Sequence, residues 1–118
     1  MKILLTGFDP FGGEAVNPAS EAVSRLKAPK GSRLVKLRLP TAFGASGDLL
    51  CAALEREKPD LVLCVGQAAG RAAITPERQG VNRMDASIPD NAGFQPREEP
   101  VIPGGPARSE ERRVGKEC

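Results

Sequence analysis

The sequence predicts an α/β fold: an open, mostly parallel sheet with helices on both faces, an α/β/α sandwich. Short apolar runs alternate with segments of helical periodicity, in the order β-α-β-α-β within residues 1–66. The third run, LVLCVG at residues 61–66, is apolar throughout, which is typical of a strand buried on both faces of a parallel sheet. Each run is followed by a loop that contains glycine. Together these observations imply parallel strands joined by right-handed crossovers.

The first two predicted elements are a strand and a helix. Residues 2–6 form a short apolar strand. Asn17 is a suitable helix N-cap, and Pro18 suits the first helical position. An apolar stripe at helical spacing follows, made of Ala19, Ala22, Val23 and Leu26. We expect this helix to end at Pro29-Lys30-Gly31.

The next strand and helix show the same alternation. Residues 34–39, LVKLRL, place Lys36 and Arg38 between apolar residues, which indicates a strand with one wetter face. Residues 47–58 form a helix, with Asp48 near its start and Lys58 at its end, as the helix dipole favours. Its main face is expected to consist of Leu50, Ala53, Leu54 and Glu57.

Composition limits the classes of function. The 118 residues suffice for one domain, and a net charge of +2 without a basic cluster indicates neither a nucleic-acid nor a membrane surface. The apolar runs are too short to span a membrane, and no export signal precedes them, so we expect a cytoplasmic protein. Three irregularly spaced cysteines predict neither a disulfide framework nor a zinc site. Since the chain has no histidine, it cannot complete any histidine-dependent catalysis alone.

The glycine-containing loops predict a binding site. Parallel strands carry their ligands outside their carboxyl ends, so the loops GFDPFGG, PTAFG and GQAAGR should open on one edge of the sheet. We expect Phe8, Phe11, Thr41 and Gln67 to converge there, around something small, flat and amide-like. The first loop does not follow G-x-G-x-x-G, and no G-K-[ST] is present, so a phosphate loop is disfavoured. The alternative is a turn whose phenyl rings only cap the core.

The second half of the chain is less regular. Residues 71–91 suggest short strands and turns, and residues 91–107 are rich in proline and glycine, as expected of an extended surface segment. The last stretch, RSEERRVGKEC, matches the translation of a common sequencing-library adapter. We therefore divide the chain into residues 1–107, the N-terminal part of a domain, and residues 108–118, a non-native tail.

Several motifs in order resemble one enzyme family. TGFDPFGG, VNP, LPTAF, VGQAAGRAAITPERQGVN and IPDN are similar to segments of the pyrrolidone carboxyl peptidases, also called pyroglutamyl peptidase I. The family's glutamate signature, G-x(2)-[GAP]-x(4)-[LIV]-[ST]-x-E-[KR], is met by Gly66, Ala69, Ile74, Thr75, Glu77 and Arg78. The resemblance covers residues 1–107, and it implies an N-terminal, truncated portion of the family's α/β domain.

The resemblance implies a function and site residues. In this family a Cys-His-Glu triad hydrolyses the amide bond after an N-terminal pyroglutamate, without a metal or other cofactor. Glu77 matches the acidic member of the triad. Phe8 and Phe11 match the residues that enclose the pyrrolidone ring. The remaining substrate-binding positions are Asn17 and Gln67, which recognise the lactam, and Thr41 and Ile88, which line the pocket. The implied partners are peptides with N-terminal pyroglutamate, and the full-length form is expected to be a homo-oligomer.

The chain also departs from the family pattern. The nucleophilic cysteine and the histidine belong to later segments that this sequence lacks, so we expect no turnover from these 118 residues. Cys64 lies in the third predicted strand and is interpreted as a structural thiol. Ser87 stands where relatives usually carry arginine. Two alternatives therefore stay open: a non-catalytic fragment or small-ligand binding module that keeps the pyrrolidone pocket, and, on a similar architecture, an enzyme like the nucleoside phosphorylases.

Overall fold

The computed structural model describes residues 1–108. Five regular elements follow one another as strand β1 (Lys2–Phe8), helix α1 (Pro18–Arg25), strand β2 (Arg33–Leu39), helix α2 (Ala45–Glu57) and strand β3 (Leu61–Cys64). This is the predicted β-α-β-α-β order, and it confirms the α/β fold class. The predicted tail lies outside the described residues, apart from Arg108.

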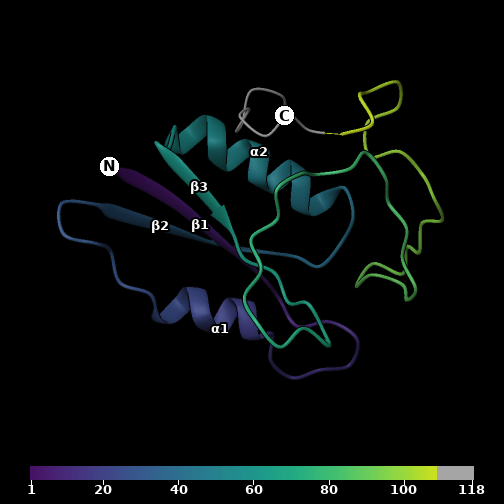
Figure 1. Ribbon diagram of the computed structural model, residues 1–118, viewed down its shortest axis with the longest axis horizontal. Helices are drawn as coiled ribbons and strands as arrows, with labels where there is room; N and C mark the ends of the chain where they lie inside the picture. Colours follow the sequence, from purple (N-terminus) through teal and green to yellow (C-terminus); the bar gives the residue numbers. More distant parts are fainter. Residues whose placement is uncertain (109–118) are drawn as a thin grey trace.

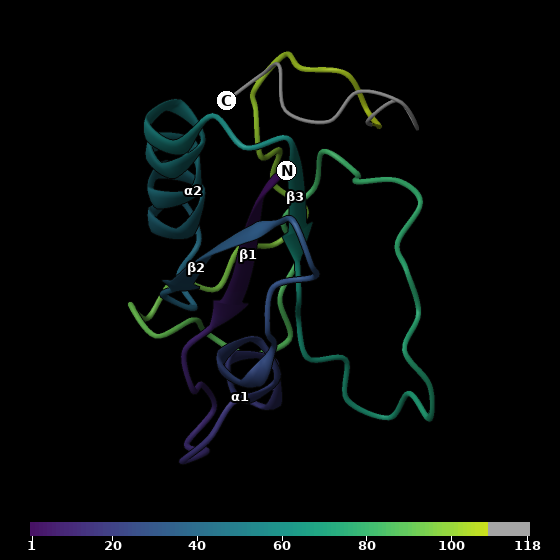
Figure 2. The ribbon, with the colours of Figure 1, turned by 90° about the vertical axis from the view of Figure 1, so that its left-hand side faces the viewer.

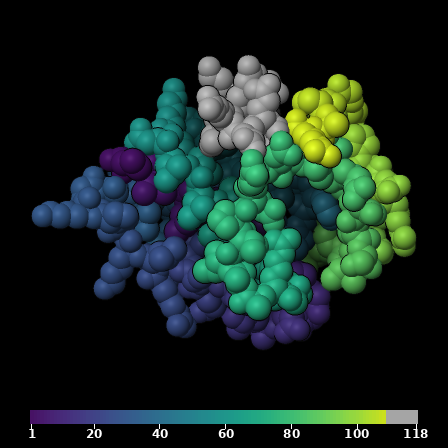
Figure 3. All heavy atoms as spheres, in the orientation of Figure 1, coloured from purple at the N-terminus to yellow at the C-terminus, as the bar shows by residue number. Residues whose placement is uncertain are grey.

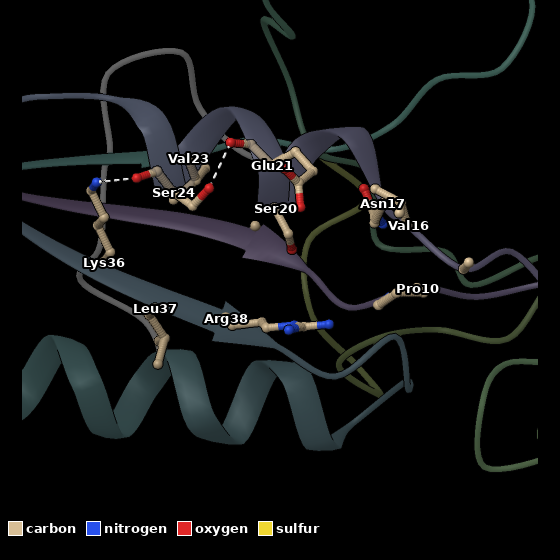
Figure 4. A pocket seen from close by; sticks show the side chains of 12 residues that line it. Pro10, Val16, Asn17, Ser20, Glu21, Val23, Ser24, Lys36, Leu37 and Arg38 are labelled. Atoms are coloured by element: carbon tan, nitrogen blue, oxygen red, sulfur yellow. Dashed lines mark hydrogen bonds between the residues drawn. The ribbon is translucent and has the colours of Figure 1, made fainter.

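The three strands form one parallel sheet in the order β2-β1-β3 (Figure 1). The central strand β1 pairs with β2 over its whole length, from Lys2 opposite Arg33 to Phe8 opposite Leu39. On its other side it pairs with β3, from Ile3 opposite Leu61 to Thr6 opposite Cys64. The two helices lie on opposite faces of the sheet, as a right-handed crossover to each side of β1 requires (Figure 4). The central strand is therefore the most deeply buried element, with Leu4 and Leu5 at its centre.

Helix α1 begins as the sequence predicts. The side chain of Asn17 accepts a hydrogen bond from the Ala19 backbone N–H at 2.9 Å, and Pro18 occupies the first turn. The helix ends at Arg25, earlier than predicted, because Leu26 adopts an extended conformation. Of the predicted apolar stripe, Ala19 and Val23 are buried against the sheet, whereas Ala22 and Leu26 are exposed.

Helix α2 starts two residues before the predicted position and ends at Glu57, where Lys58 takes the left-handed conformation (φ 45°). Its predicted inner face is confirmed, since Ala53 is buried and Leu50, Leu54 and Glu57 are partly buried. Glu57 anchors the end of the helix to the start of the sheet. Its carboxylate contacts Lys2 Nζ at 3.2 Å and Arg33 Nη2 at 3.8 Å.

The prediction that the third strand is buried on both faces is wrong for this chain. In β3, Leu61 is 47% exposed and Leu63 is 51% exposed, and Cys64 is exposed as well. The physical reason is position, because β3 is an outer strand of the sheet, while α1 packs on β1 and β2 and α2 packs on β2. An apolar strand is buried only where neighbouring elements cover it.

The residues after β3 form the predicted turns, but among residues 66–108 isolated bridges take the place of the predicted short strands. Isolated antiparallel bridges join Val81 to Arg108 and Met84 to Glu99. In Figure 3 these residues, green to yellow, spread over the front and right-hand side of the molecule. Within residues 66–108 only Pro96 is fully buried, so this half of the chain adds little to the core.

Candidate functional site

Polar groups tie together the loops that follow β1 and β2. The Asp9 carboxylate oxygen Oδ1 accepts a hydrogen bond from the Thr41 backbone N–H at 2.7 Å, and the Asp9 carbonyl accepts one from the Thr41 hydroxyl at 3.0 Å. The same carbonyl accepts a hydrogen bond from Asn17 Nδ2 at 3.1 Å. Asp9 therefore joins the first loop to the second loop and to the start of α1.

A third segment, residues 88–94, lies over both loops. Asn91 Nδ2 donates to Asp9 Oδ1 at 3.2 Å and to the Pro10 carbonyl at 2.9 Å, while the Asn91 N–H donates to the Thr41 carbonyl at 2.9 Å. Asp90 Oδ2 accepts from the Phe43 backbone N–H at 2.8 Å. The loops after β1 and β2 and the IPDN segment thus form one hydrogen-bonded unit.

The carboxylate of Asp90 organises its own turn as well. Its Oδ1 accepts hydrogen bonds at 2.9 Å from the backbone N–H groups of Ala92 and Phe94. Desolvation acts to raise the pKa of Asp90, but hydrogen bonds from backbone N–H groups, Phe43 first among them, outweigh it and hold that pKa below its ordinary value. The ring of Phe94 meets that of Phe43 edge to face, with centroids 6.1 Å apart. These contacts fix the second loop against residues 88–94.

The predicted apolar site residues lie on this unit. Phe8 ends β1, Phe11 follows three residues later, and both are partly buried. Ile88 is 49% exposed, and its Cδ1 lies near Gly12, 3.8 Å from where a Cβ on that glycine would stand. The structure therefore brings Ile88 to the loop that carries the two phenyl rings.

Two of the predicted polar site residues, Asn17 and Thr41, make structural hydrogen bonds in this chain. Asn17 is 2% exposed, and its amide uses Oδ1 to cap α1 and Nδ2 to hold Asp9. Thr41 is occupied by Asp9 through both its N–H and its hydroxyl. Gln67, by contrast, follows β3 and is exposed. The substrate-binding roles of all three stay predictions.

Glu77 lies in the long exposed stretch after β3. Its Oε1 accepts a hydrogen bond from Arg71 Nη1 at 2.8 Å, and the same nitrogen donates to the Thr75 hydroxyl at 2.7 Å. The Glu77 side chain is 73% exposed. Figure 2 shows this stretch as a wide teal-to-green loop that runs out from the end of β3, away from the sheet. The carboxylate is thus paired with Arg71 and faces solvent.

Two hollows of the molecule each contain one predicted site residue, Asn17 or Glu77, but not the two phenyl rings. A groove of about 400 Å³ lies between α1 and β2, where Lys36 Nζ donates to the Ser24 carbonyl at 2.9 Å (Figure 4). It touches the loop after β1 through Pro10, Ala15, Val16 and Asn17. A second hollow, of about 540 Å³, surrounds Glu77 and is formed by residues 76–79. Neither of these two hollows is lined by Phe8 or Phe11, both of which are partly buried.

Two further features bear on the kind of site. In the described part of the chain, no group of three or more histidine, cysteine, aspartate or glutamate side chains is placed to hold a metal ion. Among the same residues, no helix combines the length and apolar character needed to cross a bilayer. Cys51 and Cys64 are not joined in a disulfide.

Comparison with known proteins decides the family. The family model described as pyroglutamyl peptidase matches residues 1–110. The chain belongs to the pyroglutamyl peptidase family. The pyrrolidone-carboxylate peptidase of Levilactobacillus brevis is 56% identical over 108 residues, which are 91% of this chain and 53% of that protein. The enzyme of the same name from Enterococcus faecalis is 51% identical over 106 residues, 89% of this chain and 50% of its own length.

Solved structures of the pyroglutamyl peptidase family share the fold. Pyroglutamyl peptidase I of Bacillus amyloliquefaciens matches with a TM-score of 0.86 at 51% identity, over 92% of this chain and 53% of that one. A pyrrolidone carboxyl peptidase variant from Pyrococcus furiosus matches with a TM-score of 0.86 at 43% identity, over the same shares of the two chains. The chain therefore spans about half the length of the relatives it matches.

Sequence reasoning missed the residues that hold the site together. Asp9, Asp90 and Asn91 were absent from the predicted site, yet they make the contacts between its loops. A signal was present in the sequence, since Asp-Pro and Pro-Asp-Asn are turn formers whose side chains bind nearby backbone N–H groups. The sequence did not indicate which distant loops these three side chains would contact.

Proposed function

We propose that this chain is the N-terminal part of a cysteine omega-peptidase that removes N-terminal pyroglutamate from peptides, and that the 118 residues alone do not turn over substrate. The observation that supports this most is the family match over residues 1–110, with 56% identity to a pyrrolidone-carboxylate peptidase. The absence of histidine supports the second part, because the family's mechanism needs an imidazole.

In this proposal the hydrogen-bonded loops form the substrate pocket. Phe8 and Phe11 enclose the flat pyrrolidone ring, with Thr41 and Ile88 at its edge. Asn17 and Gln67 recognise the lactam amide. Since the Asn17 amide already binds Asp9 and caps α1, it acts on substrate through its remaining N–H or through the loop it holds. The rest of the domain would complete this pocket.

Glu77 is the acidic member of the proposed triad. Its job is to orient an imidazole and to stabilise the imidazolium that forms when the thiolate attacks the carbonyl carbon. Among residues 1–108 the Glu77 carboxylate is bound by Arg71 through Oε1, which leaves Oε2 for the imidazole. The cysteine and the histidine are contributed by the half of the domain that this chain does not span.

The remaining proposals concern the setting of the enzyme. Cys51 and Cys64 form no disulfide with each other, which suits a reducing compartment, and we place the protein in the cytoplasm. Its partners are pyroglutamyl peptides, and the full-length form is a homo-oligomer.

We further propose that residues 108–118 are not part of the domain. The match of relatives over 106 to 108 residues supports a boundary near Ala107, and the family model extends to residue 110.

The test compares three proteins. They are this chain, a chimera in which residues 1–107 continue into the C-terminal half of the Levilactobacillus brevis relative, and the Glu77→Gln variant of that chimera. Release of a chromogenic amine from a pyroglutamyl amide is expected from the chimera alone. By analogy with Asp→Asn changes in serine-protease triads, the Glu77→Gln variant should lose roughly 10²–10⁴ in turnover.

Glu98→Gln provides a matched control. Glu98 is 75% exposed and pairs with Arg83 at 3.8 Å, much as the 73% exposed Glu77 pairs with Arg71. The control should retain full activity. Equal rates from the two variants would show that Glu77 is not a member of the triad, and turnover by the 118 residues would contradict the proposal that this chain is catalytically incomplete.

Binding of 2-pyrrolidone by this chain without turnover would support the alternative of a small-ligand module. The family membership removes the nucleoside-phosphorylase alternative.

A further inference from the structure

The two outer strands of the sheet present different edges. Strand β2 carries Lys36 and Arg38, both exposed, and charged side chains on an edge strand discourage pairing with a further strand. Strand β3, LVLC, carries no charged residue. Among residues 1–108 it pairs with β1 only, so its outer backbone N–H and C=O groups have no strand partner. Of the two edges, that of β3 is open to strand addition.

The surface beside this edge is apolar and uncovered. Leu61 and Leu63 alternate along β3, so they lie on one face of the sheet, and each is about half exposed. The loop that follows the strand is uncovered too, since residues 66–80 are all exposed and Ile74 is 98% exposed. Single exposed apolar residues are ordinary, but Leu61 and Leu63 belong to a strand with an unpaired edge.

We propose that β3 and residues 66–80 form a docking surface for the C-terminal half of a pyroglutamyl peptidase, which the chain can bind as a separate polypeptide. The size of the occupant supports this, since the relatives contain about as much chain again as the part matched here. A strand added beside β3 satisfies its free backbone groups, and the rest of that half covers Leu61, Leu63 and Ile74. The bound half also meets Glu77, which lies within the same loop.

A second copy of this chain fits the surface less well. Two copies joined through β3 would pair over strands of four residues. Such a short ladder leaves the loop at 66–80 uncovered, and an interface of that size is below what stable association needs. The inference rests on the family membership and on the proposal that this chain is the N-terminal part of the enzyme.

The experiment co-expresses this chain with the affinity-tagged C-terminal half of the Levilactobacillus brevis relative. We expect the two to co-purify as a 1:1 complex in sedimentation velocity. Leu63→Lys places a charge on the β3 face and should raise the dissociation constant about tenfold or more, and Leu61→Lys should act in the same direction. Leu49→Lys is the matched control, because Leu49 is 47% exposed like Leu61 but lies on α2. It should leave the dissociation constant unchanged.

Three results would overturn the proposal: recovery of the C-terminal half only apart from this chain or as insoluble material, a complex equally sensitive to Leu49→Lys, or a symmetric dimer of this chain that Leu63→Lys dissolves. Far-UV circular dichroism of each variant alone confirms that the sheet and helices persist. Hydrolysis of a pyroglutamyl amide by the complex is a separate readout. A 1:1 complex without hydrolysis would contradict the proposed function and leave the docking surface supported.

Discussion

Replacing Gly7 with alanine should loosen the packing of α1 on the sheet. Gly7 lies in β1, opposite Arg38, on the face that α1 covers. A Cβ built on Gly7 would stand 3.0 Å from Ser20 Cα, 3.1 Å from Ser20 N and 3.2 Å from the Ala19 carbonyl carbon. All three are backbone atoms of α1. No side chain can therefore move aside, and the helix itself must shift.

The size of the effect follows from two opposed contributions. Overpacking of a close backbone contact costs about 1–3 kcal/mol. Alanine restricts the unfolded chain more than glycine does, which offsets about 0.4–1 kcal/mol. The net expected loss in the free energy of unfolding is about 1–2 kcal/mol. The shift also disturbs Ala19 and Val23, which are 4% and 5% exposed and form the contact of α1 with the sheet.

Urea unfolding followed by far-UV circular dichroism measures this loss as a lower midpoint at an unchanged slope. Gly47→Ala is the matched control, because Gly47 lies in the first turn of α2 with no atom within 4 Å of its built Cβ. The same substitution there should stabilise the protein by up to about 1 kcal/mol. If Gly7→Ala proved as stable as the wild type while Gly47→Ala behaved as expected, the close approach of α1 to β1 would be wrong.

Two further predictions concern single side chains. Asn17→Ala removes the cap of α1 and the hydrogen bond to Asp9, so unfolding by urea should show a loss of about 1–2 kcal/mol, whereas Asn17→Asp, which keeps the cap, should lose less. The hydrogen bond from Lys2 is the largest cause that holds the pKa of Glu57 below its ordinary value, with desolvation opposing it and Arg56 adding to it. Because a lowered pKa stabilises the folded state above the unfolded-state pKa, the stability gap between wild type and Glu57→Gln should be constant near neutral pH. It should shrink as the pH falls below about 4.3, and a gap independent of pH would exclude this ion pair as its source.

The sequence alone determined the elements and their order. Hydrophobic periodicity and helix-end residues are local properties, so they located three strands and two helices to within a few residues. Parallel pairing followed from the alternation of strand and helix, and the family motifs identified the enzyme class. The N-cap at Asn17 is an example of such a local property, because its side chain accepts a hydrogen bond from Ala19, two residues along the chain.

The tertiary structure decided what each residue contacts far along the chain. Gly7 was expected to begin the loop GFDPFGG. It lies instead within β1, where α1 leaves no room for a side chain. Asp9 and Asn91, 82 residues apart, meet only because the loops that carry them share one edge of the sheet. The apolar run LVLC predicts burial, but burial depends on the elements on either side. With β1 on one side of β3 and no strand on the other within residues 1–108, its leucines remain half exposed.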